Sequence, residues 1–83
     1  MQVWYFGNAV TTKTCTIGNY LIASIRSTNL NTKPTITGAE YIDYVQATQP
    51  TTMTAYRYKI TSTTVTTKNT INDNAFYAVE ISG

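Results

Sequence analysis

The stretch Tyr56-Arg57-Tyr58-Lys59-Ile60 alternates bulky apolar side chains with cations at every step. An antiparallel strand with one solvated face has this period of two, because successive side chains point to opposite faces of the sheet. The stretch therefore predicts a strand that turns its two tyrosines and its isoleucine toward a core and its two cations toward water.

Other parts of the chain show strand patterns as well. In residues 20–27, the apolar side chains of Leu21, Ala23 and Ile25 share one face. We predict strands over residues 2–6, 9–17, 20–27 and 75–81, and the longest extended segment over residues 53–67. Turn residues separate these segments, so we expect an all-β fold, a small antiparallel sandwich or barrel of about five to seven strands. Residues 1–83 are expected to form a single β domain, because 83 residues hold one core.

The dipeptide Gly18-Asn19 is the clearest turn in the chain. Glycine at the first central position of a two-residue loop suits a type II′ turn, which joins adjacent antiparallel strands. We therefore predict a β-hairpin that pairs residues 9–17 with residues 20–27.

Residues 38–47 fit two structures. Thr37 and Glu40 match a capping box, in which each side chain satisfies a backbone donor at the start of a helix. This favours a short helix near residues 38–47. The Tyr and Val content favours a strand instead. A regular strand would separate the apolar residues poorly, with Ile42 and Tyr44 on one face and Tyr41, Asp43 and Val45 on the other.

The composition favours β structure and excludes two common ways of stabilising a small domain. Eighteen threonines and seven tyrosines, with only 12% charged residues, are typical of sheets. Because the chain has one cysteine and no histidine, it holds neither an internal disulfide nor a Cys/His zinc site. Self-association or docking on a larger partner remains as a source of stability. We expect Cys15 to be a buried structural residue rather than a reactive thiol.

The inventory of reactive side chains argues against an enzyme. Without histidine there is no ordinary Ser-His or Cys-His pair, and the four glycines form no phosphate-binding loop. We interpret Glu40 and Asp43 as solvated charges rather than a catalytic pair. Asp73 lies in an Asn-Asp-Asn turn that lacks the spacing of a calcium loop. We therefore expect no catalysis, no cofactor and no metal.

Charge and hydropathy limit the partners. The net charge of +2, without a run of like charges, argues against nucleic acid as a partner. No apolar run is long enough for a membrane-spanning helix, so we expect no membrane partner. The N-terminus lacks the basic and apolar regions of a secretory signal peptide.

These patterns together predict a structural or interaction protein. The most concrete form is a phage or viral virion component, a capsid decoration (cement) or head-fibre protein assembled in the host cytoplasm, with copies of itself and a larger assembly such as a capsid as partners. The apolar N-terminus supplies the candidate interface residues Val3, Trp4, Tyr5 and Phe6, because so apolar a terminus is a liability when exposed. One alternative is a carbohydrate-binding or adhesin domain that uses Trp4, Tyr5 and turn asparagines. A third is a barrel that binds single-stranded nucleic acid.

Overall fold

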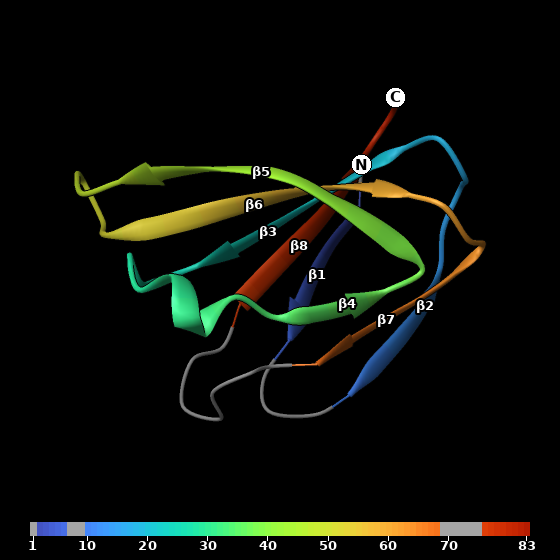
Figure 1. The fold of residues 1–83 in the computed structure, drawn as a ribbon, viewed down its shortest axis with the longest axis horizontal. Coiled ribbons are helices and arrows are strands. Elements are labelled where there is room, and N and C mark those ends of the chain that lie inside the picture. Colours follow the sequence, from blue (N-terminus) through green and yellow to red (C-terminus); the bar gives the residue numbers. More distant parts are fainter. Residues whose placement is uncertain (1, 7–9, 69–75) are drawn as a thin grey trace.

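The structure, a computed structural model, describes residues 2–6, 10–68 and 76–83, and the side chains of residues 10–68 and 77–83. These residues form two antiparallel sheets that face each other (Figure 1), which confirms the predicted all-β class. The larger sheet has the strand order β1-β8-β3-β6-β5 and the smaller one has the order β2-β7-β4. The elements are β1 (Gln2–Phe6), β2 (Thr11–Thr14), β3 (Tyr20–Ile25), the 3-10 turn η1 (Leu30–Thr32), β4 (Thr35–Thr37), β5 (Ala39–Ala47), β6 (Met53–Ile60), β7 (Thr64–Lys68) and β8 (Phe76–Ile81).

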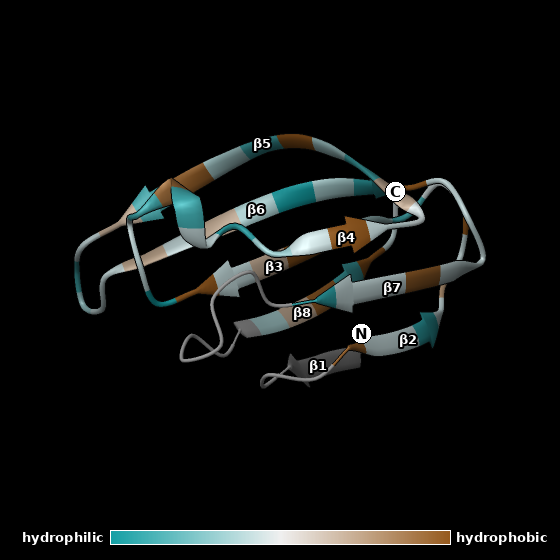
Figure 2. Ribbon diagram, turned by 60° about the horizontal axis from the view of Figure 1, so that its bottom comes forward, coloured by the Kyte–Doolittle hydropathy of each residue, from teal (hydrophilic) through white to brown (hydrophobic). Residues whose placement is uncertain are grey.

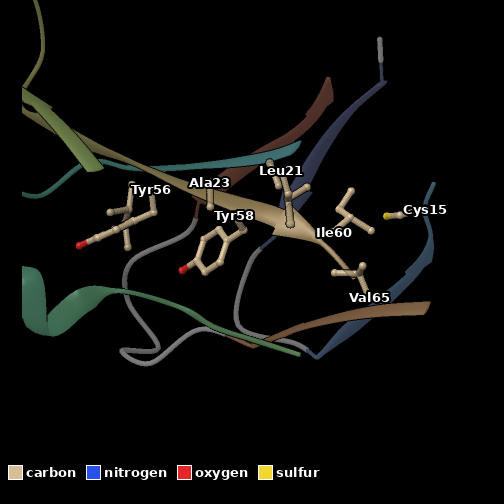
Figure 3. Packing of buried hydrophobic residues seen from close by; sticks show 9 residues of the cluster. Cys15, Leu21, Ala23, Tyr56, Tyr58, Ile60 and Val65 are labelled. Atoms are coloured by element: carbon tan, nitrogen blue, oxygen red, sulfur yellow. The ribbon is translucent and has the colours of Figure 1, made fainter. Parts of the chain in front are cut away.

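The core lies between the sheets and is built mainly from β3 and β6. Both predicted alternations are confirmed, since the apolar faces of these strands are buried and Arg57 and Lys59 are exposed. Figure 3 shows how the buried side chains line up under β6 toward β7. Burial of each large side chain stabilises the fold by about 1.5–3 kcal/mol. The cluster consists of Cys15, Leu21, Ala23, Ile25, Tyr56, Tyr58, Ile60, Val65 and Ala78.

The predicted turn at Gly18 is present, but the predicted hairpin is wrong. The Asn19 N–H donates to the Thr16 carbonyl (3.2 Å), and Gly18 occupies the third turn position with φ +94°, as in a type II turn. Strand β2 pairs with β7 in the smaller sheet, whereas β3 pairs with β6 and β8 in the larger one. The turn itself bonds to β6, where Ile60 N–H donates to the Asn19 carbonyl (2.8 Å). Residues 15–19 therefore form a corner between the sheets.

The extended segment predicted over residues 53–67 is two strands. β6 ends at Ile60, and β7 begins at Thr64 in the other sheet. The connection is held by Gly38, whose carbonyl accepts hydrogen bonds from the N–H groups of Thr61 and Ser62 (3.0 Å each). Both the link from β4 to β5 and the link from β6 to β7 thus change sheets at the same place.

Of the two structures that residues 38–47 fit, the strand is the one that forms, and the helical alternative is wrong. Thr37, the expected helix cap, is the last residue of β4, and Gly38 has φ +86°, outside the helical region. The chain leaves this corner fully extended as β5 and pairs with β6 over its length. Its hydrogen-bond partners are therefore in the neighbouring strand rather than in its own turns.

The N-terminal segment forms one edge of the larger sheet. β1 pairs with β8, with Val3 opposite Val79 and Tyr5 opposite Tyr77. The predicted interface residues Val3 to Phe6 thus have a backbone partner within the chain, while their side chains lie outside the described part. In the described ranges, no helix has the length and apolar character needed to cross a membrane.

Candidate functional site

Strand β5 forms the other edge of the larger sheet and is the longest strand described. Its nine residues pair only with β6, so its outer backbone edge has no partner strand among the described residues. Residues 40–47 are all exposed, including the large apolar side chains of Ile42 (41%) and Val45 (70%). Figure 2 shows apolar segments along this edge strand. An open, partly apolar edge is a template for pairing with another chain.

A β-bulge sets which side chains of β5 face inward. Tyr41 lies opposite Tyr58 and Asp43 lies opposite Arg57, so Ile42 is the extra residue. Regular alternation would place Tyr41 and Tyr44 on opposite faces, but the bulge brings both onto the inner face. The three-residue spacing that resembled a helix is explained by this bulge.

Four tyrosines meet on the inner face of β5 and β6. The ring of Tyr41 contacts the ring of Tyr58 edge-on (5.7 Å between centroids, 66°). Tyr56 lies between Tyr41 (6.4 Å) and Tyr44 (6.1 Å), with both pairs tilted. Tilted and edge-on arrangements are favourable because the edge of one ring is positive and the face of the next is negative.

The tyrosine cluster opens into a small pocket beside η1. Its walls are Leu30, Lys33, Tyr41, Tyr44 and Tyr56, and its volume is about 100 Å³. The ammonium of Lys33 lies 4.1 Å from the centroid of the Tyr41 ring, a cation–π contact. Three of the five lining residues of the pocket are therefore tyrosines, and the Lys33 ammonium lies against one of them.

The hydroxyl of Tyr56 is buried beside this pocket without a hydrogen bond in the described structure. Burial raises the pKa of Tyr56, and the hydroxyls of Thr32 and Thr54 lie close enough to oppose that shift in part. Both threonines donate elsewhere, Thr32 to the Asn29 carbonyl (2.6 Å) and Thr54 to the Ser27 carbonyl. The oxygens of both threonines can still accept a hydrogen bond, so they are the nearest partners for the Tyr56 hydroxyl within the described structure.

The outer face of the same strands carries ionic contacts. Arg57 donates to both carboxylate oxygens of Asp43, from Nε (3.0 Å) and Nη2 (2.8 Å), across the β5–β6 pair. The guanidinium carbon of Arg57 lies 5.7 Å from the centroid of the Tyr20 ring, and the ammonium nitrogen of Lys59 lies 5.8 Å from it. Asp43 is thus a paired surface charge, consistent with its pairing opposite Arg57 in the β5–β6 register.

The other residues considered from the sequence are scattered. Cys15 is buried as expected, and burial together with Glu80 raises its pKa to about 11, which is unlike a reactive thiol. Glu40 lies on β5 opposite Lys59. Asp73 lies outside the described residues. No group of three or more potential metal ligands occurs in the described part of the chain.

The sequence pattern pointed to β1 as the candidate interface, and the tyrosine pocket was missed. The pocket combines β5, β6 and residues 30–33, which are remote in sequence. The available hint was the spacing of Tyr41 and Tyr44, which fits the helical alternative for residues 38–47 and is explained by the bulge. No protein-family model, curated protein or solved structure matches this chain.

Proposed function

We propose that this chain is a non-catalytic interaction protein that docks on a larger protein assembly through the open edge of β5. The observation that carries the proposal is the nine-residue edge strand with Ile42 and Val45 exposed on it. An extended segment of a partner that pairs with β5 would gain main-chain hydrogen bonds, and the exposed apolar side chains would add buried area.

The assembly we propose is a virion, in which the chain acts as a decoration or head-fibre component. The support is compositional, since a low-charge chain rich in Thr, Asn and Tyr with one cysteine is what we associate with proteins that work outside cells. Copies that also associate with one another would dock together, so a modest interface per copy is sufficient.

The first test uses association in solution. We expect light scattering over a dilution series to show a dimer or larger species for the natural chain. Val45→Lys places a charge on the edge and should weaken this association about tenfold or more, because edge lysines block strand pairing. Val10→Lys is the matched control, since Val10 is also an exposed valine (59%) but precedes β2 in the other sheet. If the natural chain stays monomeric at high concentration, the expected self-association through β5 is contradicted.

The second test addresses the assembly itself. The chain should sediment with virus particles from its own source in a density gradient. The Val45→Lys variant should stay near the top of the gradient, while Val10→Lys sediments like the natural chain. Particles that lack the chain, or that retain both variants equally, contradict docking through β5.

A further inference from the structure

The outer face of the smaller sheet has the composition of a solvated surface. The side chains that alternate with its more buried residues are threonines, with Lys68 at one end. These threonines are Thr12 and Thr14 on β2, Thr64 and Thr66 on β7, and Thr35 and Thr37 on β4. An antiparallel sheet with one face in water is expected to be polar on that face.

The outer face of the larger sheet is apolar along β3 and β8. Leu21, Ala23 and Ile25 are buried in the core, so the residues between them face outward. Ala78 of β8 is buried and lies opposite Ala23, so the residues on either side of Ala78 face outward as well. The outward side chains are those of Tyr20, Ile22 and Ser24 on β3 and of Tyr77, Val79 and Ile81 on β8.

Five of these six outward side chains are aromatic or aliphatic. Strands that are covered on both faces are apolar throughout, whereas strands with one solvated face alternate apolar and polar residues. β3 and β8 therefore have the composition of strands that are covered on both faces, although the described residues form only two layers. An apolar surface in the middle of a sheet is typical of a contact with another protein.

β5 and β6 place a balanced set of charges beside this apolar surface. Glu40 lies opposite Lys59, and Asp43 lies opposite Arg57, all on the same outer face. Asp43 and Arg57 form an ion pair, whereas no ion pair joins Glu40 or Lys59 to another residue in the part of the chain that the structure describes. Two acids and two cations favour neither a strongly acidic nor a strongly basic partner. A second copy of the same face is neutral too, and it offers both Glu40 and Lys59 a charge of opposite sign.

The cations mark the border between the charged and the apolar part of the face. Arg57 and Lys59 both lie near the ring of Tyr20, which is the neighbouring outward residue of β3. Protein interfaces have this arrangement, with an apolar centre, a polar rim, and tyrosine and arginine enriched.

The size of the face suits a whole sheet of a partner. Five strands spaced about 4.8 Å apart, each about six residues long at about 3.3 Å per residue, make a face of roughly 24 by 20 Å. Two such faces in contact bury on the order of 1,000 Å², which is the lower limit for a specific interface. Because the limit is only just reached, the affinity should be moderate.

We propose that the outer face of the larger sheet packs against the same face of a second copy, with β3 and β8 at the centre of a two-fold symmetric dimer. Sheets that pack face to face lie about 10 Å apart, so their outward side chains interdigitate. This contact uses the faces of β3 and β8, whereas the proposed docking on a larger assembly uses the backbone edge of β5. The two proposals therefore stand or fall separately.

The first test places a cation in the middle of the apolar surface. The natural chain should dimerise with a dissociation constant on the order of micromolar, and Ile22→Lys should weaken this at least tenfold in sedimentation equilibrium. Thr66→Lys is the matched control, because Thr66 lies on the outer face of the middle strand of the other sheet.

Ile22 separates the face contact from pairing at the β5 edge. β6 lies between β3 and β5, so Ile22→Lys does not touch a strand that is added at the edge. Val45 cannot serve this purpose, because it lies opposite Ala55 on the outer face as well as on the edge strand.

The second test uses only exposed charges, so it does not depend on the stability of Ile22→Lys. Glu40→Lys makes the face positive and Lys59→Glu makes it negative, so each variant should associate at least threefold more weakly than the natural chain. In an equimolar mixture, the two variants should form a heterodimer at least tenfold tighter than either homodimer. Native mass spectrometry with one variant labelled with nitrogen-15 measures the three species.

Lys68→Glu is the matched control for charge, because it makes the same change on β7 of the smaller sheet. Its mixture with Glu40→Lys should contain no heterodimer tighter than the Lys68→Glu homodimer.

Three results would overturn the proposal: a natural chain that stays monomeric at millimolar concentration, Ile22→Lys that associates like the natural chain, or charge variants that do not prefer each other. Self-association that is weakened by Val45→Lys but not by Ile22→Lys would place the contact at the β5 edge. That result would support docking through β5 and remove the face-to-face dimer.

Discussion

At the residue scale, Cys15 shows how the fold controls a reactive group. The carboxylate of Glu80 accepts hydrogen bonds from the Thr16 N–H (2.9 Å) and the Asn19 side chain (3.0 Å), at the corner that follows Cys15. Burial and the negative charge of Glu80 both disfavour the thiolate and raise the pKa of Cys15 to about 11. The thiol therefore stays protonated at neutral pH.

We predict that iodoacetamide alkylates Cys15 about a hundredfold more slowly in the folded protein than in urea at pH 8, because the thiolate is the reactive form. The pKa is raised above its value of 9.0 in the unfolded chain. The associated stability is therefore complete below pH 9 and is lost as the pH rises toward 11. Mass spectrometry gives the rate, and urea melts of the natural chain and Cys15→Ala give the pH dependence. Equal alkylation rates in both states would contradict the burial of the thiol.

A second prediction at this scale compares two glycines with positive φ. A Cβ at Gly38 would overlap the carbonyl oxygen of Thr64, whereas a Cβ at Gly18 meets nothing within 4 Å. Gly18→Ala should cost about 1–2 kcal/mol, from the left-handed backbone alone. Gly38→Ala should cost more, about 3 kcal/mol or above, because two backbone segments must also separate. Chemical denaturation of both variants measures the difference, and equal losses would show that the β4–β5 corner relaxes freely.

At the scale of elements, local alternation was a good guide to the faces of strands and a poor guide to their partners. The buried faces of β3 and β6 followed directly from the positions of Leu21, Tyr56 and Tyr58. The sheet changes at residues 15–19 and 61–63 have no comparable local pattern, because they depend on contacts such as that of Gly38 with Thr61. The glycine at position 18 predicted a turn, but it did not predict that the strands before and after the turn lie in different sheets.

The bulge in β5 explains why the candidate site could not be predicted from the sequence. Ile42 breaks the period of two, so neither the helical nor the regular strand pattern described Tyr41 and Tyr44 correctly. The residues that line the pocket come from β5, β6 and the segment 30–33, and only the packing of these segments brings them together. The apolar N-terminus was visible in the sequence, but its pairing with β8 was not.

We predict that deletion of Ile42 preserves the fold. Without the extra residue, Tyr41, Asp43 and Tyr44 alternate regularly and keep their present faces. The free energy of unfolding should change by about 1 kcal/mol or less, since Ile42 is exposed.

Deletion of Val45 is the matched control for this experiment. It would turn Gln46 outward and break the hydrogen bonds of Gln46 to Thr54 (3.2 Å) and to the Thr28 carbonyl (2.9 Å). This variant should lose about 2 kcal/mol or more. Denaturation curves of the two deletion variants give their free energies of unfolding. A larger loss of stability for the Ile42 deletion than for the Val45 deletion would contradict the register assigned to β5.

At the scale of the whole molecule, the larger sheet ends in two edges of different character. β1 pairs with β8 over five residues, and β5 pairs with β6 over most of its nine. Among the described strands, β8 would become the edge if β1 were absent. The sequence alone pointed to the first edge as the interface, whereas the structure draws attention to the second.

The last prediction separates folding from docking at these edges. Deletion of residues 2–6 should lower the free energy of unfolding by about 2 kcal/mol or more, because the β8 backbone loses its partner on one side. In an 83-residue domain this corresponds to a fall in the melting temperature of roughly 8 °C or more. Val45→Lys should leave the melting temperature of the dissociated protein nearly unchanged and weaken association instead. Scanning calorimetry at low concentration and light scattering at high concentration distinguish the two effects. A deletion variant that is fully stable but no longer associates would assign the docking role to β1 and remove it from β5.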